Sequence, residues 1–481
     1  KTALLRGDVF SIRFTILIDT FIYKFWHVEM LGMAIKPETK HSLVLICLAF
    51  LSIGFLMQYY NQGETRMTSP TGMVISEVKM EEDPQDVRVL VNPKNTKARL
   101  ELISNPSVDV RHEFGQSFSA QMPRDKINTI DMLATVTEIP AYRIAFRKDF
   151  GPRGTGVCGN YICEGSESNT CPKDCGTTPF SRKCSPTNQK PYSVTQMNSG
   201  KMDLGRNVKI AIIDTGAISH PDYSNNIILC ADTTQRGITK GCADASQMGH
   251  GTHIAGLIGA EGGPDGEGMI GSAPAAKLII IKACDNDGIC YADDIAEAIF
   301  YAAKNGANIV SMSFGSEIDS SLIHNAISKQ PNILFVASAG NNGPGLDTIL
   351  YPAANPAVVA VAAHDTDMVG ASFSSRGITD SNDASIGARE VEFSAGGVGI
   401  ESTNNDGCYS GLSGTSFSAP VIAGAAAGVW DKSDGTRDSK GNPEATRKYL
   451  LNISKDIIAA NGDGATSGYD VMSGYGLPVL Q

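Results

Sequence analysis

The sequence lacks an excess of positive charge. Its 40 lysine and arginine residues are outnumbered by 51 aspartate and glutamate residues, which gives a formal net charge of −11 at pH 7. Binding to a phosphate backbone requires a basic surface, so the composition argues against a nucleic-acid partner. The chain also lacks long internal repeats and low-complexity tracts, so neither a solenoid nor a disordered array is indicated.

No apolar run reaches the roughly 20 residues that a membrane-spanning helix needs. Residues 43–57 form an unbroken apolar run that follows Lys36 and Lys40. A short basic region before such a run is typical of a signal peptide, which we place at residues 33–60. Because no clear small-residue cleavage site follows, an uncleaved membrane anchor at residues 43–57 is the alternative. Residues 1–32 precede this signal and are assigned no function.

The sequence has 11 cysteines. Cys47 lies inside the apolar run, and the other ten form an even set in polar or loop-like surroundings. Such a set indicates disulfides and an oxidising compartment. Reduced cytosolic thiols are the alternative, which the export signal disfavours. The ten are Cys158, Cys163, Cys171, Cys175, Cys184, Cys230, Cys242, Cys284, Cys290 and Cys408.

Four of these cysteines lie in a short module, residues 158–176, with the spacing C-x4-C-x7-C-x3-C. Zinc fingers and ribbons use other spacings. The intervening acidic residues favour a disulfide-stapled loop that holds calcium, and zinc stays open as the alternative. The module resembles small cysteine-rich repeats of secreted proteins. Two further pairs are close enough in sequence to bond locally and leave a third as the remainder: Cys230–Cys242, Cys284–Cys290 and Cys184–Cys408.

Residues 74–150 alternate short strand-like and helix-like pieces, which predicts a small α+β domain. Residues 87–93 and 108–114 are the first candidate strands. Residues 120–135 indicate a turn followed by an amphipathic helix, and residues 141–147 indicate a last strand.

The pattern changes over residues 190–481. Continuous apolar runs alternate with helix-like stretches such as residues 293–306. This alternation predicts an α/β fold, a mostly parallel sheet with helices on both faces. In such sheets functional sites form where the strands end. The apolar runs are 207–216, 277–284, 307–315, 332–341 and 357–363.

Two polar residues are candidates for such a site. Asp214 ends the first apolar run, where a lone aspartate is usually a turn or cap residue. His250 lies between two glycines before a helix, which suits a proton acceptor that a substrate must approach closely. A metal site shared with His253 is the alternative, but no glutamate lies between the two histidines.

Hydroxyl groups gather in residues 410–424, where Ser413, Thr415, Ser416 and Ser418 precede a run of small residues. The ordinary interpretation is a helix start, where Ser, Thr and Gly are common. Pro420 is tolerated in the first turn of such a helix. A serine at the helix start also has its hydroxyl and its own N–H near the positive end of the helix dipole, which favours a developing oxyanion.

Asp214, His250 and Ser416 follow the chain order that subtilisins use. The motifs are DTG at 214–216, HGTH at 250–253 and GTSFSAP at 414–420. On these motifs, residues 190–481 resemble the subtilisin-like serine protease family. The resemblance implies polypeptide substrates and an acyl-enzyme intermediate. Ser416 would be the nucleophile and His250 its base, with Asp214 orienting the base.

The resemblance extends to Asn341 in SAGNNG. It implies that the Asn341 amide is an oxyanion-hole donor beside the N–H of Ser416. A type I′ turn built by Asn and Gly is the alternative.

The family binds its substrate as an added strand, and main-chain pairing of this kind makes few demands on sequence. The resemblance places this strand against Ser313, Phe314 and Gly315. Phe314 and Ile295 would border an outer apolar pocket. Leu350 would lie at the base of the primary pocket and make it shallow and apolar. No carboxylate cluster marks a preference for basic residues.

Calcium is the implied cofactor, and no organic cofactor is indicated. Asp222 and Asp265 fall where the family has ligands of a calcium site, and carboxylates with backbone carbonyls suit this ion. Two solvated loop acids are the alternative.

The resemblance makes residues 74–150 a pro-domain, an intramolecular inhibitor removed by self-cleavage between Phe150 and Tyr192. An independent binding domain is the alternative. We therefore predict a secreted or surface-anchored serine endopeptidase made as a precursor. Two rivals remain: a catalytically silent pseudoprotease that binds peptides, and a zinc-binding adhesion or regulatory protein centred on residues 158–176.

Overall fold

The computed structural model describes residues 86–144, 184–378, 387–430, 442–457 and 468–481. All of them belong to one unit of the chain, Pro84–Gln481. The upstream segment, the signal and the cysteine-rich module lie outside the described residues. Within the described ranges, no helix has both the length and the apolar character needed to cross a membrane.

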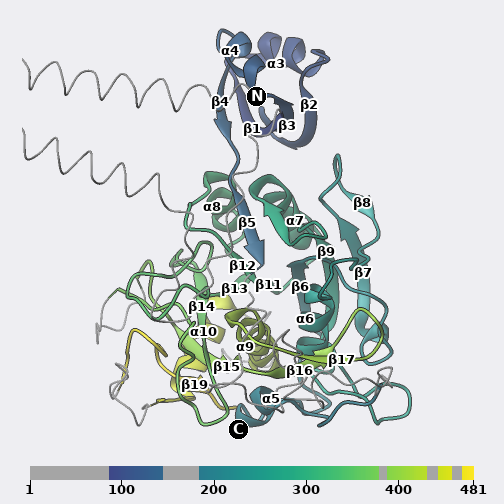
Figure 1. Cartoon of the computed structure of the whole chain (residues 1–481), viewed down its shortest axis with the longest axis vertical. Helices are drawn as coiled ribbons and strands as arrows, with labels where there is room; N and C mark the ends of the chain where they lie inside the picture. The colour runs from purple at the N-terminus through teal and green to yellow at the C-terminus, as the bar shows by residue number, and fades with distance from the viewer. Residues whose placement is uncertain (1–85, 145–183, 379–386, 431–441, 458–467) are drawn as a thin grey trace, which may run out of the picture. The chain divides into compact units, whose positions relative to one another are not determined.

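An eight-stranded sheet forms the centre of the larger part of this unit (Figure 1). All neighbouring strands run parallel except the last pair, so the prediction of a mostly parallel sheet is confirmed. In spatial order the strands are β15 (Phe393–Gly396), β14 (Val358–His364), β13 (Leu334–Ser338), β11 (Ile309–Met312), β6 (Lys209–Asp214), β9 (Lys277–Lys282), β7 (Ile227–Asp232) and β8 (Thr239–Lys240).

The apolar character of the strands explains the layers. Successive side chains of a strand point to opposite faces, and in β6 Ile210 and Ile212 belong to one core cluster whereas Ala211 and Ile213 belong to another. Both faces must therefore be covered. α6 (His250–Gly259) and α9 (Thr415–Val429) cover the first face, and α7 (Ala292–Lys304) and α8 (Ser321–Ser328) cover the second.

A smaller α+β body precedes the large sheet, with its own apolar core. Its antiparallel sheet has the order β2-β3-β1-β4, which agrees with the α+β architecture expected for this stretch. Its elements are β1 (Asp86–Pro93), α3 (Thr96–Ile103), β2 (Asp109–Phe114), β3 (Ser117–Pro123), η1 (Arg124–Lys126), α4 (Ile127–Ile130) and β4 (Ala134–Glu138).

The turn and amphipathic helix expected within residues 120–135 are only partly present, because η1 and α4 together cover residues 124–130. Residues 120–123 belong to β3, where Ala120 pairs with Val89 of β1. The following helix is the single turn α4, and β4 begins soon after it at Ala134. Strand pairing with β1 decides the structure here, because it buries Ala120 and Met122 in the small core.

The disulfides follow the expected pairs within the described residues. The two short-range bonds and the long-range bond are Cys230–Cys242, Cys284–Cys290 and Cys184–Cys408. The cysteines of the Cys184–Cys408 bond are 224 residues apart in sequence. This disulfide therefore links the start of the larger body to the hairpin of β16 (Ile400–Thr403) and β17 (Tyr409–Leu412).

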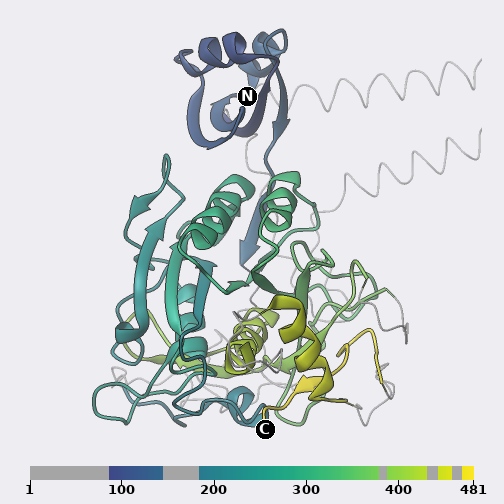
Figure 2. The same cartoon turned by 180° about the vertical axis from the view of Figure 1, so that it is seen from behind.

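A buried ion pair holds α10 (Pro443–Asn452), which packs beside α9 as the view from behind shows (Figure 2). The Nε of Arg447 lies 2.6 Å from Oε1 of Glu392, just before β15. Burial raises the pKa of Glu392, and the charge of Arg447 opposes this shift.

We expect Arg447→Met to lower the free energy of unfolding by about 3–5 kcal/mol, because it leaves a buried carboxylate without its partner. The measurement is urea unfolding in a Ser416→Ala background, which limits self-digestion. The double variant Glu392→Gln with Arg447→Met should recover most of the loss. Equal stability of the single variant and the parent would contradict the role of this pair.

Candidate active site

Asp214 is the last residue of β6 and is buried at the carboxyl edge of the sheet. Its Oδ1 lies 2.7 Å from Nδ1 of His250 and also accepts the N–H of Thr215 at 2.7 Å. A carboxylate can only accept, so Nδ1 of His250 carries the proton and Nε2 is the basic nitrogen. The pair thus fixes both the tautomer and the orientation of the imidazole.

Glycines on both sides of His250 allow it to begin α6 close to β6. Gly249 has φ +60°, and a Cβ on it would lie 2.6 Å from Oδ1 of Asn404. A Cβ on Gly251 would lie 2.0 Å from the carbonyl oxygen of Gly216. Only glycine fits either position, so the helix start can approach the end of the strand.

Ser416 is the second residue of α9 and is fully buried. Its hydroxyl donates to the carbonyl of Ser313 at 3.1 Å, and the hydroxyl of Ser313 donates to the carbonyl of Ser416 at 2.9 Å. In a regular helix the residue-420 N–H would bond to the Ser416 carbonyl, but Pro420 has no N–H. Pro420 lies in the second turn and not, as expected, in the first, and it leaves that carbonyl to Ser313.

Helices α6 and α9 pack together and bring the histidine and serine to the same edge. The ring of Phe417 lies 5.4 Å from that of His250 and 4.6 Å from that of His253. Nε2 of His253 lies 3.0 Å from the carbonyl of Ile400, and burial lowers the pKa of His253 to about 3. His253 is therefore a neutral structural residue, and the structure gives no support to a metal site with His250.

Asn341 follows β13, and its amide orientation is set by α9. Its Oδ1 accepts from both the N–H and the hydroxyl of Thr415, each at 3.0 Å. The Thr415 hydroxyl in turn accepts the N–H of Gly340 at 3.2 Å. Because the oxygen is committed to Thr415, Nδ2 must point away from it; this atom is buried and has no hydrogen-bond partner among the described residues.

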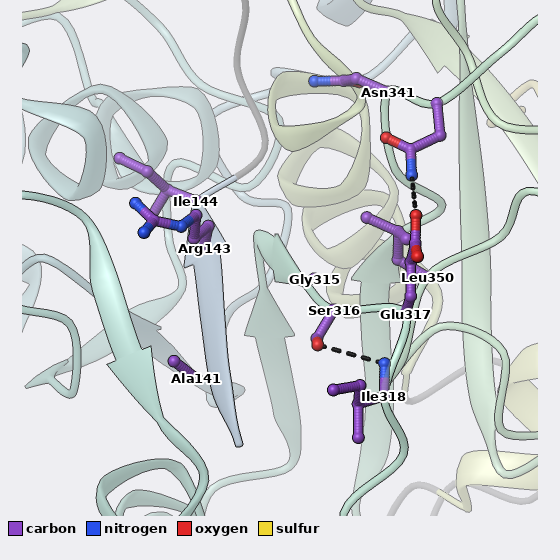
Figure 3. Close-up of a pocket in the computed structure, with 10 residues that line it drawn as sticks. Ala141, Arg143, Ile144, Gly315, Ser316, Glu317, Ile318, Asn341 and Leu350 are labelled. Atoms are coloured by element: carbon purple, nitrogen blue, oxygen red, sulfur yellow. Dashed lines mark hydrogen bonds between the residues drawn. The ribbon is translucent and has the colours of Figure 1, made fainter. Parts of the chain in front are cut away.

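A cavity of about 590 Å³ lies beside this edge (Figure 3). One wall is β5 (Ala141–Ile144), which is the middle strand of a three-stranded sheet between β10 (Ile289–Tyr291) and β12 (Phe314–Gly315). The lining residues are Ala141, Arg143, Ile144, Gly315, Ser316, Glu317, Ile318, Asn341, Asn342 and Leu350.

The residues expected to contact substrate separate into three environments. Gly315 and Leu350 line the cavity, and Leu350 fills the space above two glycines, since a Cβ on Gly315 or Gly340 would lie 2.7 Å from it. Phe314 is fully buried with Ile295 and makes an edge contact with the ring of Tyr142 at 6.1 Å. Ser313 binds Ser416 as described above.

The two residues expected to bind calcium face the same loop. Oδ2 of Asp222 accepts the N–H of Met269 at 2.7 Å and the hydroxyl of Tyr409 at 2.8 Å. A Cβ on Gly263 would lie 2.9 Å from Oδ1 of Asp222 and 3.6 Å from Oδ1 of Asp265. The two Oδ1 atoms therefore lie on one side of Gly263, and carboxylate oxygens are ligands of the kind that calcium takes.

Lys282 is a site residue that the sequence reasoning missed. It ends β9 in register with Asp214, and its ammonium donates to the carbonyl of Thr215 at 2.9 Å. Burial lowers the pKa of Lys282, and nearby carboxylates, Asp244 first, oppose that shift. The position of this lysine at the end of an apolar run was the sequence signal that could have indicated its place at the edge of the sheet.

A carboxylate, an imidazole and an alcohol gathered at the edge of a parallel sheet are the groups of a serine-nucleophile hydrolase. Comparison with known families narrows this class. The model of the subtilase family, peptidase S8, matches residues 205–476, so the chain belongs to the subtilase family of serine endopeptidases.

Known relatives agree with this assignment. A subtilisin of Bacillus sp. strain TA39 is 39% identical over 305 residues, which cover 60% of this chain and 70% of the relative. The minor extracellular protease Epr of Bacillus subtilis strain 168 is 34% identical over 293 residues and is covered to 40% of its length. The solved structure of the S41 psychrophilic protease has a TM-score of 0.57 at 37% identity, and the match covers all of it and 62% of this chain.

Proposed function

We propose that this chain hydrolyses peptide bonds through Asp214, His250 and Ser416. The observation that carries the proposal is the 2.7 Å contact of Asp214 with Nδ1 of His250, next to a helix that has Ser416 in its first turn. The Ser416 hydroxyl turns from the Ser313 carbonyl to Nε2 of His250, gives up its proton and attacks the scissile carbonyl. His250 then protonates the leaving amine, and water hydrolyses the acyl-enzyme.

The oxyanion is stabilised by two donors. The N–H of Ser416 belongs to the first turn of α9, where backbone donors have no helix partner. Nδ2 of Asn341 is the second donor, since Thr415 holds the amide oxygen on the other side. Donors fixed in advance stabilise the transition state without reorganisation.

We expect Ser416→Ala to abolish activity and Asn341→Leu to lower kcat about 100- to 1,000-fold, a magnitude known from a subtilisin donor. The measurement is peptide hydrolysis together with fluorophosphonate labelling of Ser416. Asn342→Leu is the matched control, because this exposed neighbour lines the same cavity. A processed protein that never labels at Ser416 would favour the pseudoprotease, and full activity of Asn341→Leu would contradict the oxyanion role.

We further propose that residues 74–150 are a pro-domain which inhibits the catalytic domain of residues 190–481. The supporting observation is that β5 occupies the place expected for substrate. Ile144 pairs with Phe314 and Arg143 with Gly315, antiparallel. The Tyr142 side chain fills the apolar site at Phe314, so the chain lies across its own cleft as a peptide would.

The bond that is cut lies nearer to this strand than the sequence suggested. β5 ends at Ile144, which lines the same cavity as Asn341 and Leu350. Leu350 makes this cavity shallow, which favours a small residue directly after the strand, and the next residue in the sequence is Ala145. We therefore place self-cleavage at the Ala145–Phe146 bond and not between Phe150 and Tyr192.

N-terminal sequencing of the processed protein should give Phe146 as the first residue. Ala145→Trp should slow processing at least tenfold, because a shallow cavity next to Leu350 disfavours a large side chain directly before the cut bond. Ala145→Gly is the control and should process at a similar rate. A first residue beyond Phe150 would contradict this assignment.

Export is also part of the proposal. The three disulfides of the described residues are stable in an oxidising compartment, which supports secretion with or without retention of the apolar segment 43–57.

Calcium would stabilise the loop that carries Asp265. Saturating calcium at about 100 times its Kd should stabilise the fold by about 3 kcal/mol, seen as a higher Tm than in EGTA. Asp265→Ala should remove this calcium-dependent increase, whereas the exposed control Asp287→Ala should keep it. An unchanged calcium response of Asp265→Ala would show that the ion does not bind there.

A further inference from the structure

Two adjacent carboxylates are buried in the first turn of α7. Asp293 and Asp294 have exposed fractions of 0% and 1% and follow Tyr291 of β10. Carboxylates are favoured at a helix N-terminus, but two of them side by side repel each other and are costly to bury without cations. Their partners therefore decide whether this arrangement is stable.

The partners come from the small α+β body. Nη1 of Arg88, on β1, lies 3.1 Å from Oδ1 of Asp293 and 2.6 Å from Oδ2 of Asp294. The guanidinium also stacks at 4.1 Å over the ring of Tyr291. The Arg88 side chain thus contacts both carboxylates and an aromatic face. A planar guanidinium can make these contacts together, whereas a lysine ammonium cannot.

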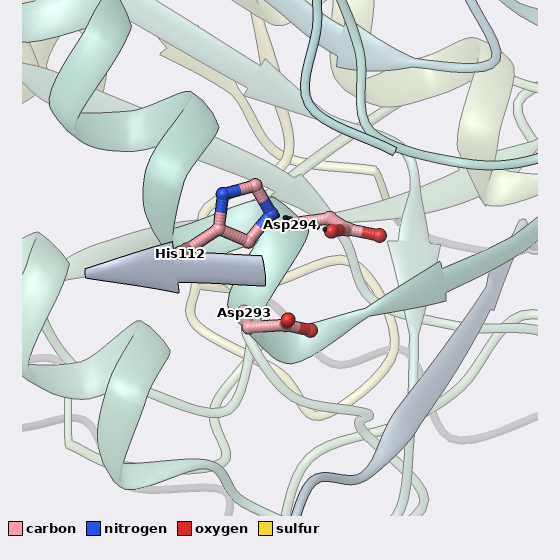
Figure 4. A group of neighbouring side chains, drawn as sticks. All are labelled: His112, Asp293 and Asp294. Carbon is pink, nitrogen blue, oxygen red and sulfur yellow. Dashed lines mark hydrogen bonds and ion pairs between the residues drawn. The ribbon is translucent and has the colours of Figure 1, made fainter. Parts of the chain in front are cut away.

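His112, on β2, completes the contact. Its Nε2–H donates to Oδ1 of Asp294 at 2.8 Å, and both side chains are buried (Figure 4). Arg88 and His112 lie on different strands from β5, which occupies the cleft. The chain before the catalytic domain therefore contacts it outside the cleft as well, and β2 adds a hydrogen bond of Arg111 with Gly237 and an ion pair of Asp109 with Arg236.

Resting on the pro-domain role proposed above, we infer that Arg88 and His112 dock on a receptor formed by Tyr291, Asp293 and Asp294, and that this docking retains the pro-domain after its bond is cut. Retention sets how long the processed protease stays inhibited. The strand in the cleft is held by main-chain pairing and by the Tyr142 side chain, and a peptide substrate can replace both kinds of contact. The site formed by Tyr291, Asp293 and Asp294 instead requires a guanidinium and an imidazole at fixed positions.

A metal ion is the competing occupant. The ligand atoms of His112, Asp293 and Asp294 lie within 4.8 Å of one another. Arg88, however, already neutralises both carboxylates through direct contacts, and a dication would have to displace it against charge repulsion. The observed contacts favour arginine.

The test uses the full chain as it processes itself. Arg88→Met should leave cleavage intact but release the cut pro-domain at least about 100-fold faster, as expected when a buried charge loses its partner. Release is followed by size-exclusion chromatography and by the lag before peptide hydrolysis. Arg124→Ala is the matched control, since its ion pair with Glu138 lies on the exposed surface of the same body, and it should behave as the parent.

A double-mutant cycle separates docking from a general loss of stability. Asp293→Asn with Asp294→Asn should speed release as Arg88→Met does, and adding Arg88→Met to that pair should cause little further loss. Additive effects, release unchanged by Arg88→Met, or release triggered by EDTA in the parent would each overturn the inference.

A second readout covers variants that do not process. In the Ser416→Ala precursor, Arg88→Met should increase hydrogen exchange of β5 and Arg124→Ala should not. Equal protection of β5 in both variants would overturn the inference. Failure of the parent chain to cleave itself would instead contradict the proposed function, and the exchange experiment would still decide the docking.

Discussion

The structure depends on the hydrogen bond between Asp214 and His250, because it joins the end of a strand to the start of a helix across a gap of 2.7 Å. No bulky residue is possible next to it. Gly249 and Gly251 have no space for a Cβ, and Thr215 binds both elements, since its N–H donates to Asp214 and its hydroxyl accepts the N–H of Gly251. The residues around His250 are small because the start of α6 comes so close to the end of β6.

A second constraint fixes the serine. The proline of α9 removes one helix hydrogen bond, and the carbonyl that loses it bonds to Ser313 at the end of β11. The same helix start orients Asn341 through Thr415. One short segment of α9 thus links Ser313 after β11, the turn after β13 and Ser416. The proposed catalytic groups are therefore held by regular elements and not by long loops.

The sequence predicted the features that are local or periodic. Continuous apolar runs located the parallel strands, and the motifs around Asp214, His250 and Ser416 located the edge where they meet. The turn and helix expected within residues 120–135 shrink to η1 and α4, since pairing with β1 overrides local propensity at residues 120–123. Three kinds of contact join distant segments, and no spacing along the chain encodes them. They are the hydrogen bonds that orient the Asn341 amide, the paired bonds of Ser313 and Ser416, and the ion pairs of Arg88. The hydrogen bond from Lys282 to the Thr215 carbonyl is a further example.

The three-stranded sheet has a consequence for the protein if β5 is removed in the processing proposed above. β10 and β12 are then two strand edges that face each other across a gap one strand wide. Unpaired edges accept any extended backbone, because main-chain groups are the same in every protein. Folded proteins rarely offer such a backbone, whereas unfolded ones always do. The processed enzyme would therefore favour unfolded protein substrates, and it would distinguish substrates by unfolding more than by sequence.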